Sequence, residues 1–295
     1  MMSPFSRIFS PAKTPRRRGF LGVLDPLPFS ASLRLCARLF RVFLIGAALA
    51  LPVTLSAEET PSVWPMPSSL PSVPPGVNIA TYPFPKVDWL LRVQTNIKKA
   101  RAGAASIRLV FDGDSITDWW TARAKDLWNE RYGKLNSIDF GIAGDGTQQL
   151  LWRLSQGQVD GLHPKLVVLM IGTNNSGGQT AEQVAEGIAA IVTEYRKRCP
   201  DAVILLQAIF PRGQLATDPF RAKIGAINKI ISKLADGEKV LYLDFSDKFL
   251  ERDGALSPEI MPDFLHPSPK GYQIWADAIQ PVIDKYFPGQ SPDNP

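Results

Sequence analysis

The stretch "IRLVFDGDSIT", residues 107–117, places a short apolar run directly before a polar turn that contains glycine. An apolar run of this length is typical of a strand that is buried on both faces of a parallel sheet. Two carboxylates and two hydroxyls lie in and just after its end, so the first question is which side chain is the reactive one. Asp112 and Ser115 are the two candidates.

Four further apolar runs follow, each bounded by polar or Gly-rich residues: SIDF (137–140), LVVLMI (166–171), VILLQAI (203–209) and VLYLDF (240–245). Helical patterns separate them, including a capping box formed by Thr180 and Gln183 and a helix start at Asp218. The alternation of strand and helix predicts an α/β domain over residues 86–288. Its parallel five-stranded sheet is expected to carry helices on both faces.

The chain has 295 residues and a net charge of +5, but the positive charge is concentrated at the N-terminus. Residues 1–57 contain eight of the 33 Lys and Arg and one of the 28 Asp and Glu, so 25 bases and 27 acids remain from residue 58 onwards. The body is therefore slightly acidic. This balance argues against a nucleic-acid partner.

The N-terminal segment has the layout of a secretory signal, with a basic start, the apolar stretch "VFLIGAALALPVTLS" (42–56) and the small residue Ala57 at the exit. The stretch is shorter than the about 20 apolar residues that cross a membrane. We therefore expect residues 1–57 to be an export signal, which makes the protein periplasmic or extracellular and brings it to the membrane only during export. An uncleaved anchor and a misassigned start are the alternatives. "RRRGFLG" (16–22) resembles a twin-arginine signal, but its apolar run is interrupted.

Residues 58–85 are rich in Pro and Ser and show no apolar period, so they are predicted to be a linker or a surface strap. An amphipathic helix is predicted after them, up to about Gly103, and residues 289–295 are expected to form a disordered tail. Cys199 is the one cysteine outside the export segment. A lone thiol forms neither an internal disulfide nor a Cys-rich metal site.

Three polar turns that contain glycine follow the first three predicted strands. They are Gly113-Asp114-Ser115, "GIAGDGT" with Gly144, and "IGTNN" with Asn174. Ser115 and Gly144 are 29 residues apart, and Gly144 and Asn174 are 30 apart, about one strand-helix unit each. In a parallel α/β sheet the carboxyl ends of the strands share one edge, and the ligand site lies there. The three turns are therefore predicted to meet.

The loop before the last helix contributes "PDFLHP", in which Asp263 and His266 are three residues apart. A serine hydroxyl becomes a good nucleophile when a histidine takes its proton, and a carboxylate fixes the tautomer of that histidine. The other histidine, His163, precedes the third strand and is expected at the opposite edge of the sheet. Attack on an ester carbonyl also creates an oxyanion, which the polar turns can bind through backbone and side-chain N–H groups.

The blocks "GDSIT", "GIAGDGTQQLLWRL", "KLVVLMIGTNN" and "DFLHPSPKGYQIWADAI" together resemble the GDSL, or SGNH, hydrolases. The second and third blocks, with "TAEQVAEGIAAIV" and "PRGQ", are most similar to the branch that contains the catalytic subunits of intracellular platelet-activating-factor acetylhydrolase. The likeness runs from about residue 105 to residue 285. It implies a three-layer α/β/α, flavodoxin-like SGNH hydrolase fold and an activity that needs no metal or cofactor.

By position, the resemblance implies that Ser115 is the nucleophile and that Asp263 and His266 complete the triad. It also implies an oxyanion hole formed by Ser115, Gly144 and Asn174. We therefore expect a serine esterase for short acyl esters, acetyl esters foremost, such as an acetylated carbohydrate. A lysophospholipid or another lipid ester is the alternative substrate, and the sequence leaves the oligomeric state open.

Asp112 departs from the acetylhydrolase pattern, in which a hydrophobic residue is common at that position, and the sequence assigns it no role. As a nucleophile it would make the protein a Mg²⁺-dependent phosphatase of the haloacid dehalogenase type, with Asp244 and Asp247 as metal ligands. That interpretation leaves the predicted oxyanion residues and the Asp/His pair without a function. We therefore favour the esterase.

Four other residues lie near the motifs, and three of them have two interpretations each. Trp119 and Trp120 could line an acyl pocket or belong to the core. Asp114 is expected to shape the turn before the nucleophile. Arg212, in "PRGQ", either borders the substrate or is a solvated loop residue.

Overall fold

The five strands form at the five apolar runs of the sequence. The computed structural model describes residues 72–290. Its sheet is parallel throughout and has the order β2-β1-β3-β4-β5, which confirms the predicted α/β fold. The strands are β1 (Leu109–Gly113), β2 (Ser137–Asp139), β3 (Leu166–Met170), β4 (Val203–Gln207) and β5 (Val240–Leu243).

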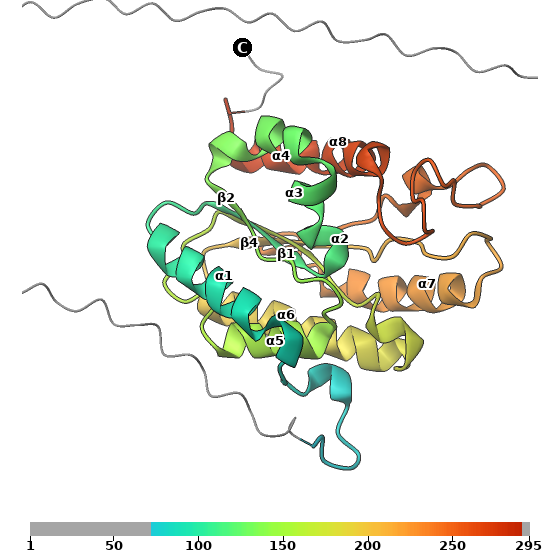
Figure 1. Ribbon diagram of the computed structural model, residues 1–295, viewed down its shortest axis with the longest axis horizontal. Helices are drawn as coiled ribbons and strands as arrows, with labels where there is room; N and C mark the ends of the chain where they lie inside the picture. Colours follow the sequence, from blue (N-terminus) through green and yellow to red (C-terminus); the bar gives the residue numbers. More distant parts are fainter. Residues whose placement is uncertain (1–71, 291–295) are drawn as a thin grey trace, which may run out of the picture. The chain divides into compact units, whose positions relative to one another are not determined.

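Helices cover both faces of the sheet (Figure 1). On one face lie α1 (Leu90–Gly103), α5 (Thr147–Ser155), α6 (Ala181–Arg198) and α7 (Pro219–Ile231). On the other lie α3 (Trp120–Arg123), α4 (Lys125–Arg131) and α8 (Pro269–Tyr286), and the short α2 (Ser115–Asp118) follows β1 directly. The described residues also contain the 3₁₀ turns η1 (Ile79–Thr81), η2 (Val87–Trp89), η3 (Gly133–Leu135), η4 (Asn175–Gly177), η5 (Ser232–Leu234) and η6 (Ser246–Phe249).

Side chains of the central strands alternate between two apolar layers, because successive residues of a strand point to opposite faces. Val110 and Val167 pack in the cluster that contains residues of α5, α6 and α7. Phe111 and Val168 pack in the opposite cluster, which contains Trp275 of α8. Since the sheet is buried on both faces, its central strands are apolar nearly throughout.

The observed β1 lies two residues further along the chain than the predicted run. Ile107 belongs to the turn after α1, where its N–H donates to the carbonyl of Gly103 (2.9 Å). At the other end, Asp112 and Gly113 still pair with β3. Asp112 is therefore a buried strand residue, and the turn before Ser115 begins only after Gly113.

Residues 72–85 lie against α5 and α6. The Asn78 side chain donates to the Gln183 carbonyl of α6 (2.9 Å), and the Thr147 hydroxyl of α5 donates to the Ala80 carbonyl (2.7 Å). Ala80 is fully buried by these contacts. The export segment 1–57, residues 58–71 of the predicted strap and residues 291–295 of the predicted tail lie outside the described residues.

Within residues 72–290, no helix is both long and apolar enough to cross a membrane. The capping box of α6 forms as predicted: the Gln183 N–H donates to the Thr180 hydroxyl, and the Gln183 side chain accepts from the Thr180 N–H. Cys199 follows α6 and is buried, and burial raises the pKa of its thiol to about 11.

Candidate active site

The site lies at the carboxyl edge of the sheet, where the loops after β1, β2 and β3 emerge. Ser115 begins α2, directly after β1. Gly144 lies between β2 and α5, and Asn174 follows β3. His266 and Asp263 come from the loop before α8.

Ser115, His266 and Asp263 form one continuous chain of hydrogen bonds. The Ser115 Oγ lies 2.8 Å from the His266 Nε2, and the His266 Nδ1 lies 2.7 Å from the Asp263 Oδ2. Ser115 is buried, whereas the Asp263 side chain is half exposed. The arrangement suits a nucleophile, a base and a carboxylate that orients the base.

The Asp263 carboxylate is held by its own loop. Its Oδ1 accepts the backbone N–H groups of His266 (2.7 Å) and Leu265 (3.2 Å). Burial alone would raise the pKa of Asp263, but the hydrogen bonds from His266 and Leu265 hold that pKa below its usual value. The carboxylate therefore stays ionised while it faces the imidazole.

The imidazole of His266 is packed by an aromatic ring. Trp119 lies with its ring centroid 4.1 Å from that of His266, at an interplanar angle of 35°. The Arg123 guanidinium lies over the Trp119 ring, 4.1 Å from its centroid. It also donates to the Pro267 carbonyl (3.2 Å). Trp119 is thus a site residue, whereas Trp120 is fully buried in the core.

The loop after β2 presents Gly144 in the left-handed region, with φ +75°. Glycine adopts this conformation without steric cost. The Asn174 amide donates one N–H to the Asp145 carbonyl (2.8 Å), so it lies beside the Gly144 loop and keeps a second N–H for a ligand. Ser115 is the first residue of α2. The N–H groups in the first turn of a helix have no intrahelical partners, so the Ser115 N–H can donate to a ligand.

A buried ionic cluster lies behind these loops, and the sequence did not predict it. Its centre is Arg153 of α5, which is 1% exposed and donates to the Asp112 carboxylate (3.0 Å) and the Asp145 carboxylate (2.9 Å). Arg153 also donates to the carbonyls of Phe140 (3.1 Å) and Gly113 (3.2 Å). It therefore ties together the ends of β1 and β2 and the loop that carries Gly144.

Asp112 belongs to this cluster and is completely buried. Besides Arg153, it accepts hydrogen bonds from the Gln158 amide (3.1 Å), the Tyr195 hydroxyl and the Gly113 N–H (2.9 Å). Burial raises the pKa of Asp112, and Arg153 opposes that rise. A side chain with all its acceptor sites occupied and no access to solvent does not fit the nucleophile of a phosphatase.

Asp114 caps α2, as its place in the turn suggested, by accepting the Ile116 N–H (3.0 Å). It is 1% exposed, and burial raises its pKa to about 7. Arg212 lies in the loop after β4, stacks on Phe220 (4.1 Å) and donates to the Thr173 carbonyl (3.1 Å). It thereby holds the residue that precedes Asn174.

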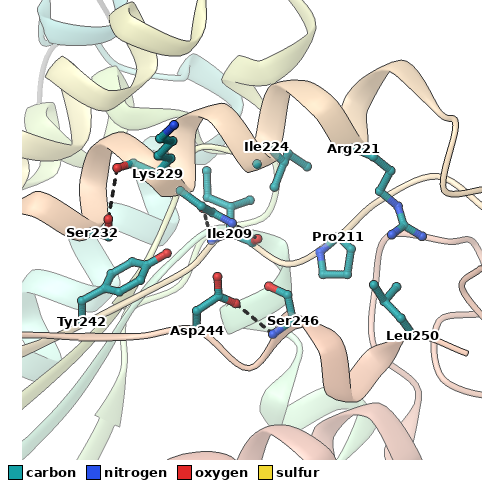
Figure 2. Close-up of a pocket in the computed structure, with 12 residues that line it drawn as sticks. Ile209, Pro211, Arg221, Ile224, Lys229, Ser232, Tyr242, Asp244, Ser246 and Leu250 are labelled. Carbon is teal, nitrogen blue, oxygen red and sulfur yellow. Dashed lines mark hydrogen bonds between the residues drawn. The ribbon is translucent and has the colours of Figure 1, made fainter. Parts of the chain in front are cut away.

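A cavity of about 410 Å³ opens between α7 and the end of β5, away from the Ser115 hydrogen-bond chain, none of whose three residues lines it. Figure 2 shows Asp244 in this cavity, where its carboxylate accepts the Ser246 N–H (2.9 Å). Asp244 and the buried Asp112 do not share a site. His163 is exposed before β3, at the amino edge, as predicted.

Comparison with known proteins points to one family. The model of the GDSL-like Lipase/Acylhydrolase family matches residues 111–274, more than half of the chain. The chain belongs to the GDSL-like lipase/acylhydrolase family. This GDSL hydrolase is 40% identical over 176 residues to human platelet-activating factor acetylhydrolase IB subunit alpha1, a match that covers 59% of this chain and 74% of the relative. Membership makes the protein an ester hydrolase.

Solved structures show the same fold. A GDSL-like lipase from Bacteroides thetaiotaomicron matches with a TM-score of 0.54 and 24% identity over 64% of this chain and 98% of that chain. An acetylxylan esterase from Geobacillus stearothermophilus matches with a TM-score of 0.50 and 21% identity over 60% of this chain and 94% of that one. The GDSL hydrolase thus shares its sheet and helix layers with both proteins.

Proposed function

We propose that this GDSL hydrolase is a serine esterase for short acyl esters, with Ser115 as nucleophile, His266 as general base and Asp263 as the carboxylate that orients the base. The observation that carries the proposal is the unbroken hydrogen-bond chain from the Ser115 Oγ through both ring nitrogens of His266 to Asp263. Only such a chain delivers a proton from the hydroxyl to a base of fixed tautomer.

In the proposed reaction the Ser115 Oγ attacks the ester carbonyl while the His266 Nε2 takes its proton. The negative oxygen of the tetrahedral intermediate accepts from the N–H groups of Ser115 and Gly144 and from the free amide N–H of Asn174. Collapse returns the proton from His266 to the departing alcohol and leaves an acyl group on Ser115. A water activated by His266 then releases the acid and restores the serine.

The proposed acyl group is acetyl. Support comes from the relative at 40% identity, which is named an acetylhydrolase. For the alcohol we propose a carbohydrate, as in the acetylxylan esterase that shares the fold. A lysophospholipid or another lipid ester is the second candidate, because the relative's name refers to platelet-activating factor.

The nucleophile is tested by measuring hydrolysis of 4-nitrophenyl acetate by the wild type and by Ser115→Ala. We expect the variant to lose at least about 10³-fold in kcat with an unchanged melting temperature, since a triad serine has no substitute. Ser155→Ala removes an exposed hydroxyl and serves as the control. An active Ser115→Ala enzyme would show that the nucleophile lies elsewhere. Addition of a chelator is expected to leave the rate unchanged.

The substrate is tested by a rate series on esters of two to ten acyl carbons, run beside release of acetate from acetylated xylan and hydrolysis of a lysophospholipid. We expect kcat/KM to be highest for acetate and to fall with chain length. A rate that rises with chain length, together with cleavage of the lysophospholipid, would overturn the acetyl assignment and favour the lipid ester.

We also propose that the enzyme acts after export, on the basis of the basic and apolar layout of residues 1–57. N-terminal sequencing of the mature protein is expected to start near residue 58. A mature protein that retains Met1 and stays in the cytoplasm would contradict this proposal.

A further inference from the structure

Lys86 brings a positive charge to the loop that carries Gly144. Its ammonium nitrogen donates to the Ala143 carbonyl (3.3 Å), and a Cβ built on Gly144 would lie only 2.4 Å from it. The Lys86 side chain therefore occupies the space that a side chain at position 144 would need. The ammonium also lies over the ring of Trp89, 5.6 Å from its centroid.

The hydrogen bond to Ala143 acts on one particular peptide group. The carbonyl of Ala143 and the N–H of Gly144 belong to the same planar unit, in which they point in opposite directions. A cation on that oxygen fixes the plane of the peptide and hence the direction of the N–H. It also polarises the group, because hydrogen bonds in a chain strengthen one another.

The neighbouring parts of this loop are held as well. The Ala143 N–H donates to the Asp118 carboxylate (3.1 Å), which pairs with Arg92 (2.7 Å). Asn174 donates to the Asp145 carbonyl on the other side (2.8 Å). Lys86 holds the peptide between these two contacts through its carbonyl oxygen.

The Lys86 ammonium is not engaged in an ion pair with any carboxylate among residues 72–290. The Lys86 side chain is partly buried. One of its N–H groups donates to the Ala143 carbonyl. A positive charge placed beside a developing oxyanion needs no reorganisation at the moment of reaction.

Lys86 comes from a segment outside the matched family region, residues 111–274. The Asn78 and Ala80 contacts to α6 and α5 anchor the preceding residues of this segment. The Phe84 N–H also donates to the Gln148 carbonyl of α5 (3.4 Å), two residues before Lys86. The segment before α1 is therefore anchored on α5 and α6, and this anchoring fixes the position of Lys86.

We propose that Lys86 is a positioning residue of the oxyanion hole: it orients and polarises the Ala143–Gly144 peptide so that the Gly144 N–H stabilises the tetrahedral intermediate. This inference rests on the proposed function. Because the interaction strengthens only as the oxyanion forms, its loss lowers kcat and leaves KM nearly unchanged.

The test is steady-state hydrolysis of 4-nitrophenyl acetate by the full-length wild type, Lys86→Met, Lys86→Arg, Ser115→Ala and the control Lys98→Met, which removes an exposed charge from α1. We expect Lys86→Met to lose about ten-fold in kcat, less than deletion of an oxyanion donor, with KM within about two-fold. Lys86→Arg keeps a cationic donor and is expected to restore most of kcat. Lys98→Met should match the wild type, and thermal unfolding should be alike for all variants.

Two outcomes would overturn the proposal. In one, Lys86→Met keeps the wild-type kcat while Ser115→Ala is inactive, which leaves the proposed function intact and removes the role of Lys86. In the other, Lys86→Met changes KM alone, which would make Lys86 a ground-state binding residue. An active Ser115→Ala enzyme would instead refute the proposed function, and this inference with it.

Discussion

Replacing Arg153 by Met should destabilise the protein far more than an ordinary surface change. The side chain is 1% exposed, and the carboxylates of Asp112 and Asp145 beside it are 0% and 2% exposed. Met keeps most of the apolar stem but removes the cation and its hydrogen bonds. The two carboxylates then remain buried without the cation that they share.

The expected loss is about 3–5 kcal/mol in the free energy of unfolding at pH 8, the usual cost of breaking a buried ion pair by removing one partner. For a domain of this size that corresponds to a fall in melting temperature of about 10 °C. Activity should fall as well, because Arg153 also donates to the Gly113 and Phe140 carbonyls, at the ends of the strands that carry the site.

The loss of stability should depend on pH, and the burial of the two carboxyls decides the direction of that dependence. Burial raises the pKa of both carboxyls, to about 6 for Asp145, and Arg153 opposes the rise for each. Without Arg153 the pKa of each carboxyl in the folded state moves further above its value in the unfolded chain. The folded variant then binds more protons than the unfolded chain, so its stability falls as pH rises from about 4 upwards. The deficit relative to the wild type should be smaller at pH 5 than at pH 8.

Urea unfolding followed by tryptophan fluorescence at pH 5 and pH 8 measures both effects. Arg101→Met, at an exposed position of α1, is the matched control and should change stability little. A loss below about 1 kcal/mol at pH 8 would refute the claim that Arg153 neutralises the cluster. A loss that is equal at both pH values would refute the claim that unpaired carboxylates are the cause.

Three further predictions concern the site itself. Asp263→Asn should lower kcat by about 10²–10⁴-fold, because the amide cannot stabilise an imidazolium, and the decisive comparison is kcat at equal melting temperature. Asn174→Ala should lower kcat by about 10²-fold with little change in KM, and a purely KM effect would exclude an oxyanion role. Asp114→Asn should stabilise the fold at pH 8, by up to about 4 kcal/mol, since the pKa of Asp114 rises to about 7 in the folded state and stability is lost as pH climbs from the unfolded value through that pKa. Urea unfolding of this variant and the wild type at pH 4 and pH 8 checks the last point, and a gain at pH 4 alone would contradict it.

Local patterns in the sequence were enough to predict the sheet and the residues that meet at its edge. Short apolar runs alternating with capped helices require a parallel sheet, and parallel strands bring their carboxyl ends together. The structure accordingly places Ser115, His266 and Asp263 within hydrogen-bond distance, although Ser115 and His266 are 151 residues apart. Their catalytic roles remain predictions that the variants above test.

No local sequence pattern predicted the contacts made by Asp112, Lys86 and Trp119. Asp112 meets Arg153 and Tyr195 across 41 and 83 residues, and Lys86 meets Ala143 across 57. A lysine just after a Pro-rich segment and an arginine within an amphipathic helix are both typical of solvated charges as long as only the sequence is considered.

The sequence by itself therefore determined the α/β fold and the set of side chains that we propose as reactive, because both depend on spacing along the chain. Only the tertiary structure decided which charges are buried together and which cation lies at the Gly144 loop. Those contacts depend on how separate helices and loops pack, and a buried charge is stable only beside a partner that the fold brings to it.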